Sequence, residues 1–194
     1  MPTPVTVLRE CDIFLTRSMG LISRAIRFFT RHIGESRTKV DHVGIVVEGG
    51  PIEDAIVVEA LSTGVVRHRL FAHYSKKRKT KLAVYRPINL TDEERATVVS
   101  AAENYVGRSY GYIKILAHFL DWLLQGAYVF RRLACMDDYP ICSWVVAYAF
   151  AKASKTFGVE PGAASPDDIW DFAVKNPDKY TLVRPLAPLI EGAP

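Results

Sequence analysis

The chain has 194 residues, of which 49% are hydrophobic and 24% charged, so it is long enough for one domain with a sizeable core. Its formal net charge of +4 is mild and comes without a nucleic-acid-binding motif, so we expect no nucleic-acid partner. The three cysteines, Cys11, Cys135 and Cys142, are an odd number without zinc-ligand spacing, and they do not suggest a disulfide framework. We therefore expect no metal and no cofactor. No basic segment precedes an apolar stretch at the N-terminus, so we expect a cytoplasmic protein, with envelope association as the alternative.

Taken in chain order, the apolar runs predict a mixed α+β domain. The predicted strands are residues 5–16 (as one strand or two), 40–47, 55–60, 65–70, 82–86 and 180–183. The strand at 40–47 is apolar almost from end to end, which predicts burial on both faces. The turn Gly49-Gly50-Pro51 connects it to the next strand, which would then form a hairpin with it.

The helices are indicated by three- and four-residue apolar spacing and by their capping residues. Residues 19–33 place apolar side chains on one face and arginines on the other. Thr91 with Glu94 is a capping box, and Ser165-Pro166-Asp167-Asp168 combines an N-cap, a proline and an acidic first turn. Residues 112–130 are strongly apolar, but three polar side chains interrupt them, so a membrane span is not predicted. We expect 112–138 to be a helical insertion or lid in a single domain covering 1–194.

The stretch from Tyr139 to Tyr148 predicts a loop that turns into a buried helix. Pro140 disfavours helical backbone for the residue before it, and apolar spacing begins after Ser143. Cys142 therefore falls in the first turn or just before it. Free backbone N–H groups and the positive end of the helix dipole favour a thiolate there over a thiol. This position suits a nucleophile, although a free cysteine alone is more often a small core residue.

A histidine and a glutamate interrupt the apolar hairpin strands. If pairing is symmetric about the Gly-Gly-Pro turn, His42 and Glu59 face each other directly on one face of the sheet. An apolar strand accommodates such polar side chains when they satisfy one another. Asp41 is a rival for orienting the imidazole, but strand alternation predicts that it points to the opposite face. A cysteine at a helix start, an imidazole and a carboxylate form the set of groups that a thiol hydrolase uses.

These segments and their order resemble the circularly permuted papain-like cysteine hydrolases related to the NlpC-type cell-wall peptidases. The matching segments are Asp12-Ile13-Phe14-Leu15, Asp41-His42-Val43-Gly44-Ile45-Val46, Val58-Glu59-Ala60 with Gly64-Val65, Gly107-Arg108-Ser109-Tyr110, Cys142-Ser143 and Ser165-Pro166-Asp167-Asp168-Ile169. Papain-like enzymes usually run Cys, His and then a polar residue. The order His, Glu, Cys in this chain is the one a permutation would produce. The chain departs from the pattern at Cys11, where such sequences often have Gly, and at Trp144, where Glu is common.

The resemblance implies an antiparallel sheet or half-barrel packed against helices, including the helix of the nucleophile. It implies Cys142 as nucleophile, His42 as base and Glu59 as the orienting residue, with Tyr110 and Ser143 in the substrate pocket. The expected activity is that of a cysteine peptidase or amidase that forms a thioester acyl-enzyme. The expected substrates are peptidoglycan peptides or other peptide amides, and acyl-lipid amides or esters.

Other interpretations of the same residues stay open. The chain could instead be a catalytically idle binding module of this fold, docking on anionic lipid or cell-wall polymer through the basic residues of 19–33 and 75–81. A metal site using His42, Glu59 and a cysteine lacks a spacing signature. The remaining histidines, including His68 and His73, have no comparable context and are predicted to be structural or exposed.

Overall fold

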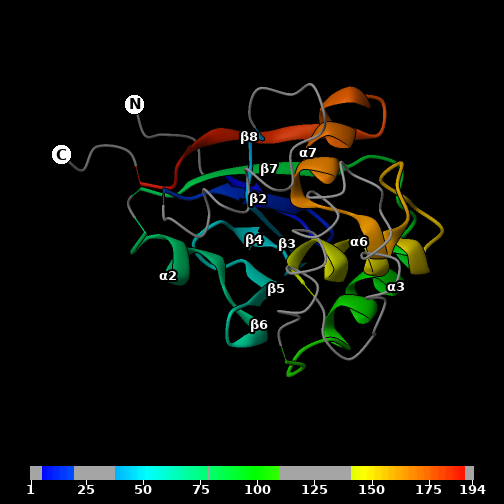
Figure 1. Ribbon diagram of the computed structural model, residues 1–194, viewed down its shortest axis with the longest axis horizontal. Helices are drawn as coiled ribbons and strands as arrows, with labels where there is room; N and C mark the ends of the chain where they lie inside the picture. The colour runs from blue at the N-terminus through cyan, green and yellow to red at the C-terminus, as the bar shows by residue number, and fades with distance from the viewer. Residues whose placement is uncertain (1–5, 20–37, 78, 110–140, 191–194) are drawn as a thin grey trace, which may run out of the picture.

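The computed structural model describes residues 6–19, 38–77, 79–109 and 141–190. A six-stranded antiparallel sheet in the order β6-β5-β3-β2-β7-β8 forms its centre (Figure 1). Most of the predicted helix at 19–33, the predicted insertion at 112–138 and Tyr110 lie outside the described residues. The predicted α+β class is confirmed.

Within the described residues, eight strands make up two sheets. They are β1 (Val7–Leu8), β2 (Ile13–Arg17), β3 (His42–Glu48), β4 (Gly50–Pro51), β5 (Ile56–Leu61), β6 (Gly64–Arg69), β7 (Lys81–Pro87) and β8 (Tyr180–Pro188). The short strands β1 and β4 pair only with each other, and the other six form the main sheet. Strand β3 lies between β5 and β2, in the interior of that sheet, which is why it reads as a continuous apolar run.

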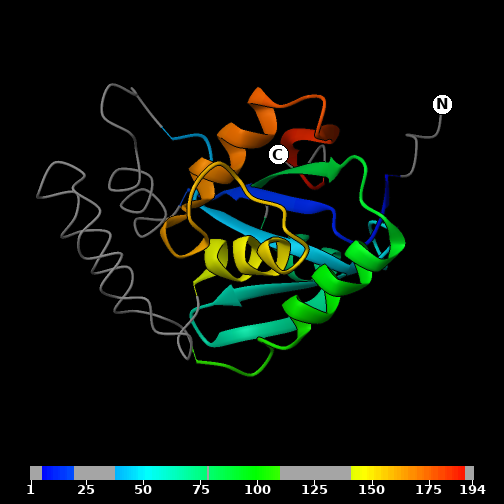
Figure 2. The ribbon, with the colours of Figure 1, turned by 90° about the vertical axis from the view of Figure 1, so that its right-hand side faces the viewer.

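The helices divide between the two faces of the sheet. They are α2 (Leu70–Tyr74), α3 (Asp92–Glu103), α6 (Cys142–Lys152) and α7 (Pro166–Lys175), with the 3-10 turn η1 (Pro161–Ala163). Helices α6 and α3 lie side by side over one face (Figure 2). The predicted capping box of Thr91 with Glu94 and the predicted N-cap Ser165 are both present, and Ser165 also forms a capping box with Asp168. Within the described residues no helix has the length and apolar character needed to cross a bilayer.

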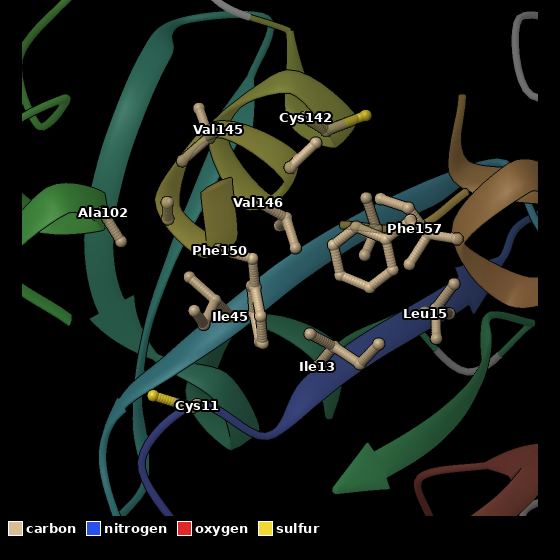
Figure 3. Close-up of a cluster of buried hydrophobic side chains, with 14 of the residues drawn as sticks. Cys11, Ile13, Leu15, Ile45, Ala102, Cys142, Val145, Val146, Phe150 and Phe157 are labelled. Atoms are coloured by element: carbon tan, nitrogen blue, oxygen red, sulfur yellow. The ribbon is translucent and has the colours of Figure 1, made fainter. Parts of the chain in front are cut away.

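Alternation along the strands separates two hydrophobic cores. Ile13, Leu15 and Ile45 point towards α6, where they pack with Val146 and Phe150 (Figure 3). The alternate residues of the same strands point to the other face, where the buried cluster is Leu8, Phe14, Val46, Ile52, Ala55, Val57, Leu70, Tyr74, Leu82 and Val84. Burial of both faces of β3 is therefore confirmed, and the second face is covered by α2.

The predicted hairpin after β3 is wrong in its turn and its register. Gly50 and Pro51 pair with Leu8 and Val7 instead of forming a tight turn. The chain reverses in the following residues, where the amide of Asp54 donates to the carbonyl of Pro51 at 2.9 Å. The pairing is Ile45 with Val58 and Val46 with Val57, with an irregularity between Val46 and Glu48. The longer turn thus shifts the register by two residues. Helix α2 was not predicted, and β8 is longer than the strand predicted at 180–183.

Candidate active site

Cys142 is the first residue of helix α6, as the sequence predicted. The residue before it, Ile141, has extended backbone and an apolar side chain that offers no cap to the first N–H groups. The cysteine is 7% exposed, and its sulfur points away from the apolar cluster around Val146 and Phe150 (Figure 3). The thiol therefore lies at the edge of the core, close to uncapped helical amides.

His42 begins strand β3, and its ring lies between the thiol and a carboxylate. Its Nε2 hydrogen-bonds Oε2 of Glu59, and its ring also hydrogen-bonds the Cys142 side chain. Because Nε2 is engaged by Glu59, Nδ1 is the nitrogen left to exchange a proton with the sulfur. Burial disfavours the charged ring, but negative charge on Cys142 and Glu59, with both hydrogen bonds, outweighs it and raises the pKa of His42 to about 10.

Glu59 is fully buried and ionised, and three side chains donate to it. Its Oε2 accepts from His42 and from the Tyr74 hydroxyl at 2.7 Å, and its Oε1 accepts from His68 Nε2 at 2.7 Å. Burial alone would raise the pKa of Glu59, but the charge of His42 and the three hydrogen bonds lower it well below its ordinary value. A buried carboxylate with this many donors has a fixed orientation.

The contact between His42 and Glu59 forms on a diagonal rather than by the direct pairing that was predicted. Continuing the register of Ile45 with Val58 sets Gly44 opposite Glu59. A Cβ atom on Gly44 would lie 2.4 Å from the Phe14 ring and 3.0 Å from the Glu59 Cβ. The absence of a side chain at this position therefore makes room for Phe14 and Glu59. Because the register differs from the predicted one by two residues, His42 and Glu59 stay on one face of the sheet. A shift of one residue would have placed them on opposite faces.

Two residues of this cluster, His68 and Tyr74, were missed by the sequence analysis. In the hairpin of β5 and β6, Val57 pairs with His68 and Glu59 with Val66, so strand alternation sets His68 diagonal to Glu59 on one face. The turn residues Ser62-Thr63-Gly64 are the sequence feature from which this hairpin, and with it the position of His68, could have been predicted. Tyr74 had no comparable signal, because it reaches Glu59 from helix α2, which was not predicted.

Asp41 and Ser143 have surroundings of their own, and Tyr110 lies outside the described residues. The carboxylate of Asp41 accepts the Ser18 amide at 2.9 Å. Ser143 is fully buried, and its hydroxyl has no hydrogen-bond partner among the described residues. In the part of the chain that the structure describes, no three or more His, Cys, Asp or Glu side chains are arranged so that they could hold a metal ion.

A family model decides the relationship of this chain to known proteins. It is the model of the permuted papain-like amidase enzymes, the YaeF/YiiX or C92 family, and it matches residues 8–118, more than half of the chain. The chain belongs to this family. The matched range contains both His42 and Glu59, while Cys142 follows it. Membership makes the protein an amidase or peptidase at the level of the family and confirms the predicted permuted papain-like relationship.

A solved structure supports the fold of this C92 family member. The chain matches the crystal structure of the metalloprotein YiiX from Escherichia coli O157:H7 with a TM-score of 0.52 and 20% identity. The match covers 78% of this chain and 69% of YiiX. The predicted permuted papain-like fold is therefore confirmed. A comparison with curated proteins found no match.

A cavity of about 370 Å³ opens near the far end of α6 from Cys142, and its walls combine aromatic side chains with two lysines. Its lining residues are Pro87, Ile88, Asn89, Leu90, Phe150, Ser154, Lys155, Thr156, Phe172, Asp178, Lys179 and Tyr180. None of Cys142, His42 and Glu59 lines it, so this cavity is separate from the candidate active site.

Proposed function

We propose that the protein is a cysteine amidase in which Cys142 is the nucleophile, His42 the general base and acid, and Glu59 the residue that orients His42. The supporting observation is that the His42 ring hydrogen-bonds the Cys142 side chain and the buried Glu59 carboxylate at once. This is the order of groups through which an imidazole activates a thiol. Membership of an amidase family supports the same reaction class.

In the proposed reaction, His42 holds the proton that the sulfur has given up, and the sulfur attacks the substrate carbonyl carbon. The oxyanion that forms receives hydrogen bonds from the uncapped N–H groups at the start of α6. The imidazolium then gives its proton to the leaving amine, the C–N bond breaks, and a thioester on Cys142 remains. His42 next deprotonates a water molecule, which attacks the thioester and releases the acid and the thiol. Glu59 holds the imidazole in place through both steps.

The proposed substrates are amides or esters of carboxylic acids, either peptide bonds of the peptidoglycan type or acyl-lipid bonds. Both groups present the same carbonyl to the thiol, so the chemistry of Cys142 does not separate them. A panel of stem peptides and N-acyl amides distinguishes them when each compound is assayed with the wild-type protein and with the Cys142→Ala variant. The substrate class is the one that only the wild type cleaves.

Labelling with iodoacetamide tests the proposed nucleophile within a single molecule. Cys11 is the internal control, since it is fully buried and burial raises its pKa to about 12. We expect Cys142 in the folded protein to be alkylated at least about 100-fold faster than Cys11 at pH 7, because only a thiolate reacts. Mass spectrometry of the peptides measures both rates. Comparable rates at the two cysteines would contradict the proposal.

A further inference from the structure

We propose that His68 is a positioning residue for this site: its Nε2–H holds Oε1 of Glu59, so that Oε2 stays directed at His42. This inference rests on the proposed roles of Cys142, His42 and Glu59. His68 lies on the neighbouring strand β6, and its side chain is 22% exposed, so its ring connects the buried carboxylate to the protein surface.

The division of donors between the two carboxylate oxygens is the main observation. Oε2 accepts from His42 and Tyr74, whereas among the described residues Oε1 accepts from His68 alone. Glu59 is fully buried, so water does not replace a lost donor without a structural change. Without His68, the carboxylate gains by rotating Oε1 towards another donor, and that rotation moves Oε2 away from the His42 ring.

The surroundings of His68 require that its Nε2 carries a proton. Its Nδ1 lies 3.1 Å from the carbonyl oxygen of Arg69, and its Nε2 lies 2.7 Å from Glu59. A carbonyl and an ionised carboxylate only accept, so both ring nitrogens donate and the ring is an imidazolium. In agreement, the pKa of His68 is raised: burial opposes the charge, but the hydrogen bond and charge of Glu59 outweigh it.

The other charged and titratable groups around the cluster do not compete for this role. Lys77 donates to His73 Nε2 at 2.6 Å, so that nitrogen is an acceptor and His73 is neutral. Burial and the Lys77 charge both lower the pKa of His73. Burial and Glu59 raise the pKa of Tyr74 well above its ordinary value, so its hydroxyl keeps the proton that it donates. Cys142, at the start of α6, interacts with the His42 ring. When His68 loses charge at higher pH, Nε2 keeps its proton because it faces the carboxylate.

A pair of variants isolates the hydrogen bond from the charge. His68→Gln and His68→Ala both remove the imidazolium, but the glutamine amide retains an N–H donor near the position of Nε2. We expect the pKa of His42, followed by NMR of labelled imidazole, to be about one unit lower in His68→Ala than in His68→Gln. The rate of Cys142 alkylation at pH 7 should be about tenfold lower in the alanine variant, with kcat reduced more than KM.

Equal His42 pKa values and equal alkylation rates in the two folded variants would overturn the proposal. If the alanine variant does not fold, NMR of the wild type decides: His68 should keep its Nε2 proton across the titration and titrate above its ordinary pKa. Loss of that proton, or an ordinary pKa, would overturn it. These measurements need no turnover. Full activity in Cys142→Ala would therefore disprove the proposed function. It would not decide whether His68 holds Glu59, which the NMR measurements test separately.

Discussion

Two places in the described part of the chain combine a cysteine with a fully buried carboxylate, and they differ in the partners of the carboxylate. Asp12, next to Cys11, accepts from Arg86 at 2.8 and 2.7 Å and from the Arg9 amide at 2.8 Å. Glu59, in the site of Cys142, accepts from two imidazoles and a phenol. A guanidinium keeps its proton at any working pH, whereas an imidazole exchanges it. The first arrangement fixes the chain, and the second is suited to moving a proton.

The cysteines differ in the same way. Cys11 is fully buried, its sulfur lies 3.5 Å from the Arg95 carbonyl, and burial raises its pKa to about 12. Cys142 has a comparably low exposure but lies at a helix start and beside an imidazole. Burial therefore does not distinguish the roles of the two cysteines. The groups next to each sulfur do distinguish them.

Removing the two cysteines should produce the largest contrast. Cys142→Ala removes the atom that forms the acyl-enzyme, so hydrolysis of p-nitrophenyl acyl esters should fall by at least about 10⁴-fold. Cys11→Ala should keep its activity and lose some stability through the small cavity that it leaves. Initial rates at matched folded concentration measure the first effect, and urea unfolding measures the second. Similar losses of activity in the two variants would remove the distinction between the sites.

Neutralising the two carboxylates should separate catalysis from stability. Glu59→Gln should lower kcat by about 10²- to 10⁴-fold, because an amide does not stabilise the imidazolium. Asp12→Asn should retain activity per folded molecule but lower the free energy of unfolding by about 3 kcal/mol, since it leaves Arg86 without its buried counter-charge. Steady-state kinetics and urea unfolding on both variants check this contrast. A catalytic loss in Asp12→Asn as large as that in Glu59→Gln would contradict it.

The pH dependence should follow from the raised pKa of His42. Since this pKa is about 10 in the folded protein and 6.5 ordinarily, the protonated ring contributes its full stability below about pH 6.5. That contribution is lost as the pH rises through about 10. In Cys142→Ala the interaction of the sulfur with the ring is gone, so NMR titration should give a His42 pKa at least about one unit lower. An unchanged value in this variant would mean that the sulfur does not interact with the ring.

The smallest effect should come from the phenol. Tyr74→Phe removes one of three donors to Glu59, and a hydrogen bond to a charged group contributes about 1.5 to 3 kcal/mol. We expect urea unfolding to show a loss within that range and kcat to fall less than in Glu59→Gln, because His42 and His68 still hold the carboxylate. A kcat as low as that of Glu59→Gln would instead make Tyr74 an essential part of the site.

Parts of the site could be predicted because their causes are local. Pro140 and the apolar spacing after Ser143 indicated a helix with Cys142 in its first turn or just before it, and α6 starts at Cys142. The capping residues Thr91 and Ser165 likewise marked the starts of α3 and α7. Each prediction depended on side chains within a few residues of the position concerned. That is the range over which capping and backbone preference act.

The sequence by itself determined most of the strands, the starts of α3, α6 and α7, and the presence of an imidazole and a carboxylate on one face. Only the tertiary structure decided the diagonal register of His42 and Glu59, because Gly50 and Pro51 pair with β1 instead of forming the turn. It also brought His68 from β6 and Tyr74 from α2 to the same carboxylate. Pairing between distant segments depends on which surfaces are buried together, and a local pattern does not contain that information.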